Sequence, residues 1–156
     1  MKIFLASDHA GFELKEKIKA LLAGKGYEVE DYGAYEMNSE DDYPDFMRKA
    51  AEAVAKCEEE NSSSSVNSER KCSAIIFGGS GQGEAMVANR IKGARAAVLY
   101  NFNEEIIKLS REHNNANVLS LGARFLTEEQ AIRAVELWLA TPFSNEPRHK
   151  RRIDKF

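Results

Sequence analysis

Cysteine is scarce in this sequence, and its two cysteines, Cys57 and Cys72, form no metal-binding or redox motif. Neither a CxxC pair nor the ligand spacing of a zinc site is present. Cytosolic proteins normally keep such isolated cysteines reduced. The sequence therefore predicts two reduced thiols in a cytoplasmic protein.

Long apolar runs and an excess of basic charge are also missing. The apolar start, Met1–Ala6, is too short for a signal peptide before Asp8, and no segment approaches the length of a transmembrane helix. The net charge of −3 gives no general attraction to nucleic acid or to a membrane surface. We therefore expect a cytoplasmic protein that binds neither nucleic acid nor membrane.

Both standard nucleotide-binding fingerprints are absent. A GxGxxG motif beginning at Gly79 would need its third glycine at the position of Glu84. A P-loop would need Gly-Lys followed by Ser or Thr, and the sequence contains no such triplet. These absences disfavour a nucleotide-binding protein.

What the sequence does contain is a regular alternation of apolar strand patterns and amphipathic helix patterns. Strands are expected at residues 2–7, 28–32, 73–77, 94–100 and 118–121, with helical patterns after each of them and a last, basic helix at 144–156. This order predicts one three-layer α/β domain over residues 1–156, with a five-stranded parallel sheet and helices on both faces. Residues 58–71 are serine-rich and almost devoid of apolar side chains, so we expect a disordered insertion there.

The most informative stretch is the turn that follows the third expected strand. Six residues, Gly78, Gly79, Ser80, Gly81, Gln82 and Gly83, separate that strand from a helix. Glycines let backbone N–H groups approach a ligand closely, and the helix N-terminus adds partial positive charge. The turn therefore predicts a site for a phosphate or a transient oxyanion.

Glu84, directly after this turn, has two interpretations. A carboxylate at a helix N-terminus commonly just stabilises the helix, by about 0.3–1 kcal/mol. A carboxylate beside an oxyanion site can also remove a proton next to a carbonyl group. Spacing alone favours the first interpretation.

Other candidate residues have equally ordinary explanations. Asp8 could cap the first helix, His9 and Arg124 could lie in solvated loops, and residues 148–152 could form an exposed basic helix face. Residues 8–9, 78–84 and 122–124 nevertheless follow strands whose carboxyl ends share one edge of the sheet. Ligands bind at that edge in open α/β folds.

Taken together, the motifs resemble one family. The sequence is similar to the ribose-5-phosphate isomerases of type B and the galactose-6-phosphate isomerase subunits. The similarity covers nearly the whole chain except residues 58–71 and a slightly longer loop near 101–103. The matching stretches are SDHAG (7–11), DYP (42–44), GSGQG (79–83), ANR (88–90), REHNNAN (111–117), GAR (122–124) and RHKRR (148–152).

The resemblance implies a Rossmann-like fold and interconversion of D-ribose 5-phosphate and D-ribulose 5-phosphate through a cis-enediolate, with no metal or organic cofactor. It also implies a homodimer, or a tetramer, with active sites shared between subunits. It assigns catalytic roles to Glu84, His113 and Asp8, with His113 opening the sugar ring. Its substrate-binding residues are Asp8, His9, Gly79, Ser80, Gly81, Gln82, Gly83, Asn114, Arg124, Arg148 and Arg152.

The sequence departs from the family pattern in one place. Many members have a cysteine, whose thiolate is the base, where this chain has Gly78. Here Glu84 is expected to take that role, as in a subset of the family. The changed base leaves open a 6-phosphohexose substrate, such as allose or galactose 6-phosphate, or a phosphosugar-binding protein without catalysis.

Overall fold

The computed structural model describes residues 1–62 and 70–156. Its centre is a five-stranded, all-parallel sheet with the order β2-β1-β3-β5-β4. The strands are β1 (Lys2–Ser7), β2 (Glu28–Asp31), β3 (Cys72–Gly78), β4 (Ala96–Leu99) and β5 (Val118–Gly122). The helices are α1 (Phe12–Gly24), α2 (Tyr43–Ser62), α3 (Gln82–Ala88), α4 (Glu104–Glu112), α5 (Glu128–Ala140) and α6 (Pro147–Ile153).

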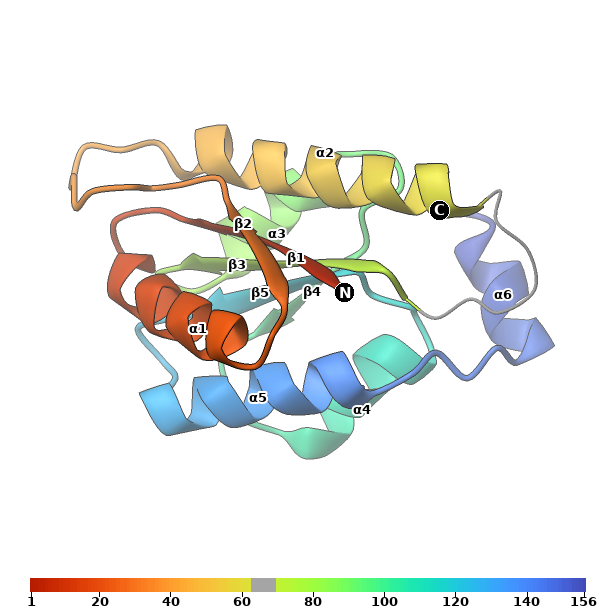
Figure 1. The fold of residues 1–156 in the computed structure, drawn as a ribbon. Coiled ribbons are helices and arrows are strands. Elements are labelled where there is room, and N and C mark those ends of the chain that lie inside the picture. Colours follow the sequence, from red (N-terminus) through yellow and green to blue (C-terminus); the bar gives the residue numbers. More distant parts are fainter. Residues whose placement is uncertain (63–69) are drawn as a thin grey trace.

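Helices cover both faces of the sheet, which confirms the predicted three-layer α/β fold (Figure 1). Side chains alternate along β1, so Ile3 and Leu5 face the helices α1, α4 and α5, while Phe4 and Ala6 face α2 and α3. β3 is buried along its whole length because it lies in the middle of the sheet. The predicted capping box of α5, Thr127 with Gln130, is present.

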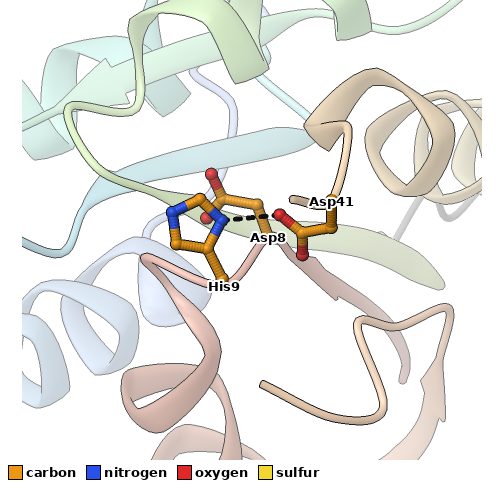
Figure 2. A group of neighbouring side chains, drawn as sticks. All are labelled: Asp8, His9 and Asp41. Atoms are coloured by element: carbon orange, nitrogen blue, oxygen red, sulfur yellow. Dashed lines mark hydrogen bonds and ion pairs between the residues drawn. The ribbon is translucent and has the colours of Figure 1, made fainter. Parts of the chain in front are cut away.

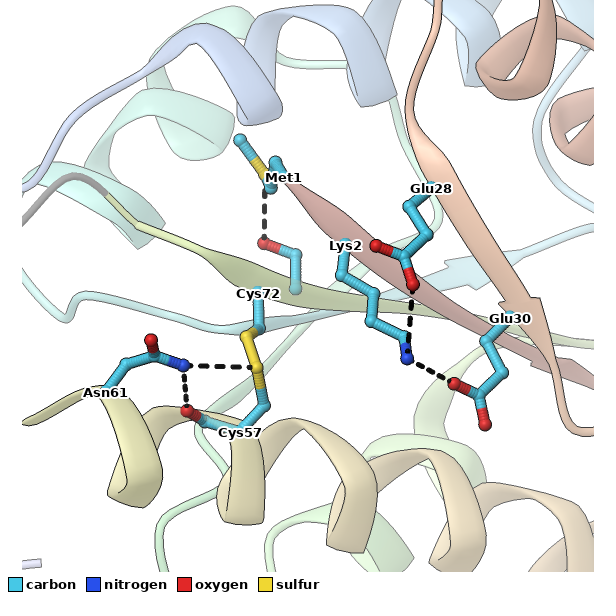
Figure 3. The surroundings of a disulfide bond; sticks show 8 residues. Met1, Lys2, Glu28, Glu30, Cys57, Asn61 and Cys72 are labelled. Atoms are coloured by element: carbon cyan, nitrogen blue, oxygen red, sulfur yellow. Dashed lines mark hydrogen bonds and ion pairs between the residues drawn. A yellow bond between two sulfur atoms is a disulfide. The ribbon is translucent and has the colours of Figure 1, made fainter.

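The cysteines differ from the prediction. Cys57 on α2 and Cys72 at the start of β3 form a disulfide, with their Cα atoms 6.3 Å apart (Figure 3). The prediction of two reduced thiols is therefore wrong for this structure. The two cysteines are 15 positions apart in sequence, but the buried face of α2 packs on the sheet where β3 begins. Sequence spacing alone does not reveal this contact.

Both ends of the segment expected to be disordered, 58–71, have defined structure. α2 continues to Ser62, and Glu58 in its last turns forms an ion pair of 2.8 Å with Arg95. Arg70 lies over the Trp138 ring, 4.6 Å from its centroid, and donates a hydrogen bond to the Leu139 carbonyl. The remainder of the expected disordered segment, 63–69, lies outside the described residues.

The two ends of the parallel strands, called here the carboxyl and the amino edge of the sheet, lead into different segments of the chain. At the carboxyl edge, the ends of β1, β3 and β5 lead into the loops that carry Asp8, Gly79 and Arg124. α4 and α5 run back from that edge, so α4 and the segment leading into α6 end at the opposite, amino edge, where the Ser144 N–H donates to the Glu112 carbonyl. No helix among the described residues is long and apolar enough to cross a membrane.

Candidate functional site

The glycine-rich turn after β3 is held close to the end of β5. Gly81 has a φ of +78°, a conformation that glycine adopts without strain, and it forms the N-cap of α3. The Ser120 hydroxyl donates to the Gly81 carbonyl at 2.6 Å. A Cβ at Gly122 would lie 2.7 Å from the Ser80 carbonyl oxygen. The turn therefore needs glycine in two chain segments to reach this compact shape.

Glu84 lies behind this turn on the first turn of α3. It is only 5% exposed, and its Oε2 atom has no hydrogen-bond partner among the described residues. Burial raises the pKa of its carboxyl, and the Asp8 charge raises it further, while backbone N–H groups of Glu84 and Gly81 act in the opposite direction. A helix-stabilising carboxylate is normally solvated, so this burial favours the functional interpretation of Glu84.

Gly78 provides the space for the Glu84 side chain. A Cβ at position 78 would overlap the Glu84 carboxylate, with Oε1 as its nearest atom. The carboxylate thus occupies the space beside β3 that the Cβ atom of any other residue at position 78 would need. The departure from the family pattern at Gly78 and the acid at Glu84 are therefore two parts of one packing arrangement.

Asp8, His9 and Arg124 lie at the same edge as Glu84. Asp8 is 7% exposed and accepts the Gly11 N–H at 3.0 Å in the turn that precedes α1. Arg124 passes over the turn, and a Cβ at Gly79 would lie 3.4 Å from its Cζ atom. One chain thus brings two carboxylates, an imidazole and a guanidinium together around the glycine-rich turn.

His9 has a partner that sequence reasoning missed. Its Nδ1 atom lies 2.6 Å from Oδ1 of Asp41, which comes from the loop between β2 and α2 (Figure 2). The sequence signal was only an acidic loop before Pro44, and nothing in it distinguishes Asp41 from its acidic neighbours. Asp8, His9 and Asp41 each place one oxygen or nitrogen atom within 4.8 Å of the others. Because two of those atoms already share a hydrogen bond, we treat the group as a histidine–carboxylate pair beside Asp8 rather than as a metal centre.

The remaining predicted site residues lie at the amino edge, away from Glu84 of the same chain. His113 is the C-cap of α4, and its ring stacks 4.3 Å from that of the buried His149. Arg148 donates from Nε to His149 Nε2 at 3.1 Å. Asn114, Arg148 and Arg152 are exposed. The predicted residues therefore form two half-sites at opposite edges of one sheet.

An open groove lies beside the glycine-rich turn. It has a volume of about 550 Å³ and lies between α3 and the edge strand β4, with Gln82, Met86, Val98 and Tyr100 among its lining residues. Met86 is 66% exposed and Tyr100 is 49% exposed. The carboxyl-edge half-site is thus bordered by an uncovered, partly apolar surface.

The fold and this edge define an α/β protein of the class that binds ligands at the carboxyl ends of its strands. A buried carboxylate, with one oxygen unpartnered among the described residues, lies there beside a glycine-rich turn at a helix N-terminus. The chain matches the Ribose/Galactose Isomerase family over residues 3–156. It is 40% identical to the ribose-5-phosphate isomerase B of Mycolicibacterium paratuberculosis over 154 residues, covering 99% of this chain and 88% of that protein. The chain belongs to the ribose/galactose isomerase family.

Solved structures agree with this assignment. A ribose-5-phosphate isomerase B from Mycoplasma genitalium, solved with bound ribulose-5-phosphate, matches with a TM-score of 0.86 and 39% identity, over 99% of this chain and 92% of that one. The corresponding protein from Thermotoga maritima matches with a TM-score of 0.84 and 43% identity, over 99% and 95% of the two chains. The predicted Rossmann-like fold is therefore confirmed.

Proposed function

We propose that the protein interconverts D-ribose 5-phosphate and D-ribulose 5-phosphate through a cis-enediolate. We infer the substrate from relatives named ribose-5-phosphate isomerase B, one of which was solved with bound ribulose-5-phosphate. The observation that carries the chemistry is the Glu84 carboxylate, which is buried directly behind the glycine-rich turn and whose Oε2 atom has no hydrogen-bond partner among the described residues.

Each part of the isomerisation has a residue suited to it. Glu84 removes the C2 proton and returns it at C1, and its raised pKa makes it a stronger base than an exposed glutamate. The backbone N–H groups of residues 79–83 stabilise the negative charge that develops on the carbonyl oxygen, at roughly 3 kcal/mol for one good donor. Asp8 borders the sugar, and its charge helps to keep the base strong.

Ring opening and part of the phosphate binding require the second half-site. We assign His113, Asn114, Arg148 and Arg152 of the partner subunit to the site built around Glu84, because in their own chain they lie at the other edge of the sheet. Arg124 and His9 contribute from the Glu84 side. The uncovered groove at Met86 and Tyr100 gives a second subunit an apolar surface on which to dock.

The substrate assignment is tested by a coupled assay that compares kcat/KM for ribose 5-phosphate with values for allose 6-phosphate and galactose 6-phosphate. We expect ribose 5-phosphate to be preferred by at least tenfold, or about 1.4 kcal/mol of transition-state binding. A higher kcat/KM for a hexose phosphate would assign the chain to the hexose branch of the family, and no turnover of any sugar would leave a binding protein.

The shared site is tested with a purified heterodimer of one Glu84→Gln chain and one Arg148→Ala chain, assayed at low substrate so that the rate reports kcat/KM. If Arg148 crosses the interface, one site collects both lesions and the other is intact. The heterodimer then recovers about half of the wild-type rate, whereas both mutant homodimers stay far lower. If Arg148 serves its own chain, each site keeps one lesion, and the absence of recovery would refute the shared site.

A further inference from the structure

The His9–Asp41 pair is a built feature of the carboxyl edge. Asp41 closes a turn in which its own N–H donates to the Asn38 carbonyl and the Glu40 N–H donates to the Asn38 side chain. Its side chain is 6% exposed, whereas that of His9 is 29% exposed. A buried carboxylate thus holds the inner side of a histidine ring whose outer side faces solvent.

This contact fixes the hydrogen-bonding role of the ring. An ionised carboxylate can only accept hydrogen bonds, so the proton of the pair lies on His9 Nδ1. The second ring nitrogen, Nε2, points away from Asp41 (Figure 2) and makes no hydrogen bond to any described residue. His9 therefore presents one oriented nitrogen at the edge where Arg124 also lies.

We propose that Asp41 is a positioning residue for the substrate's phosphate: it holds His9 so that Nε2 donates to a phosphate oxygen. The proposal rests on the proposed function, in which His9 contacts the sugar phosphate. It names a residue outside the predicted site and gives it a role through His9 rather than through direct contact with substrate.

The charges around His9 mean that two roles of Asp41 predict opposite effects on phosphate binding. Asp41 and Asp8 face the ring as carboxylates, and Arg124 faces it as a cation. The hydrogen bond to Asp41 raises the pKa of His9 and the Asp8 charge adds to this, while burial and Arg124 lower it. Asp41 itself is a negative charge near a dianion. As a bystander it would repel the phosphate, but acting through His9 it strengthens phosphate binding.

The experiment compares Asp41→Asn with a matched control, Glu40→Gln. Both remove one negative charge from the same turn, but the Glu40 side chain is exposed. For Asp41→Asn we expect KM for ribose 5-phosphate to rise by roughly tenfold, the range of one charge-assisted hydrogen bond, with kcat changed less than threefold. Glu40→Gln should leave both constants at wild-type values. A KM for Asp41→Asn that is unchanged or lower would overturn the proposal.

A double-mutant cycle tests whether the effect passes through His9. In a His9→Gln background, Asp41→Asn should no longer raise KM, and removing the charge should leave it equal or slightly lower. The same tenfold rise in that background would show that Asp41 acts on the substrate by another route and would overturn the proposal.

A readout independent of turnover separates this proposal from the proposed function. The chain has three histidines, so ¹⁵N spectra of labelled protein can be assigned with the His9→Gln variant. Asp41→Asn should lower the pKa of His9 and weaken binding of inorganic phosphate, with the melting temperature unchanged. If the wild type isomerises no sugar, the pKa of His9 and the affinity for inorganic phosphate still decide the role of Asp41. A pKa of His9 that Asp41→Asn leaves unchanged would refute the proposal.

Discussion

Two buried carboxylates in this molecule have opposite surroundings. Asp31, at the end of β2, accepts hydrogen bonds from Lys15 at 2.8 Å, Lys19 at 2.6 Å and the Gly33 N–H at 2.9 Å. Burial alone would raise its pKa, but these donors bring it below its ordinary value. The Glu84 side chain is also buried, yet its Oε2 atom has no hydrogen-bond partner among the described residues and its pKa is raised. The comparison separates a carboxylate whose oxygens are held by cations and a backbone N–H from one that keeps an unpartnered oxygen, as the proposed base requires.

The residues paired with Asp31 help to fix the backbone next to Asp8, at the edge where Glu84 lies. Lys15 is fully buried and also donates to the Ala34 carbonyl at 2.7 Å. The adjoining Gly33–Ala34 segment exchanges two backbone hydrogen bonds of 2.6 Å with Ser7, the residue before Asp8. The Lys15–Asp31 pair thus fixes the loop that lies behind Asp8, while the cost of burying Glu84 is offset only in part, by backbone N–H groups.

The largest effect is expected when the Glu84 carboxylate, the proposed base, is neutralised. Glu84→Gln should lower kcat by about 10²–10⁴-fold, the usual contribution of a general base, while KM changes little. Wild-type kcat should also fall with decreasing pH below the raised pKa of Glu84. Steady-state kinetics across pH measure both effects, and a variant that keeps near-wild-type kcat would exclude Glu84 as the base.

The same variant should be more stable than the wild type. Because the pKa of Glu84 is higher in the folded state than its ordinary value of about 4.3, its ionisation costs stability as pH rises through and above that value. Glu84→Gln should therefore melt at a higher temperature at pH 8, with the difference vanishing below about pH 4. If the variant melted at an equal or lower temperature at pH 8, the ionised Glu84 would not destabilise the folded state.

A further prediction concerns the buried ion pair of Lys15 and Asp31. Lys15→Met keeps much of the side-chain volume but leaves Asp31 with an incomplete set of donors, and removing one member of a buried pair typically costs about 3–5 kcal/mol. Urea unfolding measures this loss. The matched control is Lys17→Met, on the same helix, where an exposed lysine pairs with Glu128. Equal effects of the two substitutions would contradict a special role for the buried pair.

The smallest effect is expected at the outer partner of Asp31. Lys19 makes a 2.6 Å ion pair with Asp31, but its side chain is 38% exposed. Water and salt screen such a pair, so Lys19→Met should cost only about 0.2–1 kcal/mol. Urea unfolding at low and high salt measures it. A loss as large as that of Lys15→Met would show that the donors of Asp31 act as one unit rather than in proportion to their burial.

The sequence predicted the features that depend on neighbouring residues. The alternation of strands and helices, the turn at 79–83 and the Thr127–Gln130 capping box all follow from local patterns, and the structure has them. The position of Glu84 after that turn was also evident. Its burial was not, because burial depends on the missing side chain at Gly78 and on the packing of β3 against α3.

Features that depend on distant contacts were missed. The Cys57–Cys72 disulfide and the His9–Asp41 pair join segments whose approach is set by the tertiary fold, and no spacing rule encodes them. The placement of His113 at the amino edge follows from the direction of α4, which only the topology of the sheet determines. The extra turn of α2 before residue 63 is held by the distant pair of Glu58 and Arg95.

The absence of a side chain at Gly78 also constrains how this site can change through evolution. A cysteine at position 78 and a glutamate at position 84 compete for the same volume, so a chain with both would have to move one of them out of place. The two substitutions are therefore epistatic: each is harmful in the background that suits the other. A lineage that exchanges a cysteine at 78 for a glutamate at 84 must acquire both changes together, or pass through a sequence with neither side chain or through one in which one of the two is displaced.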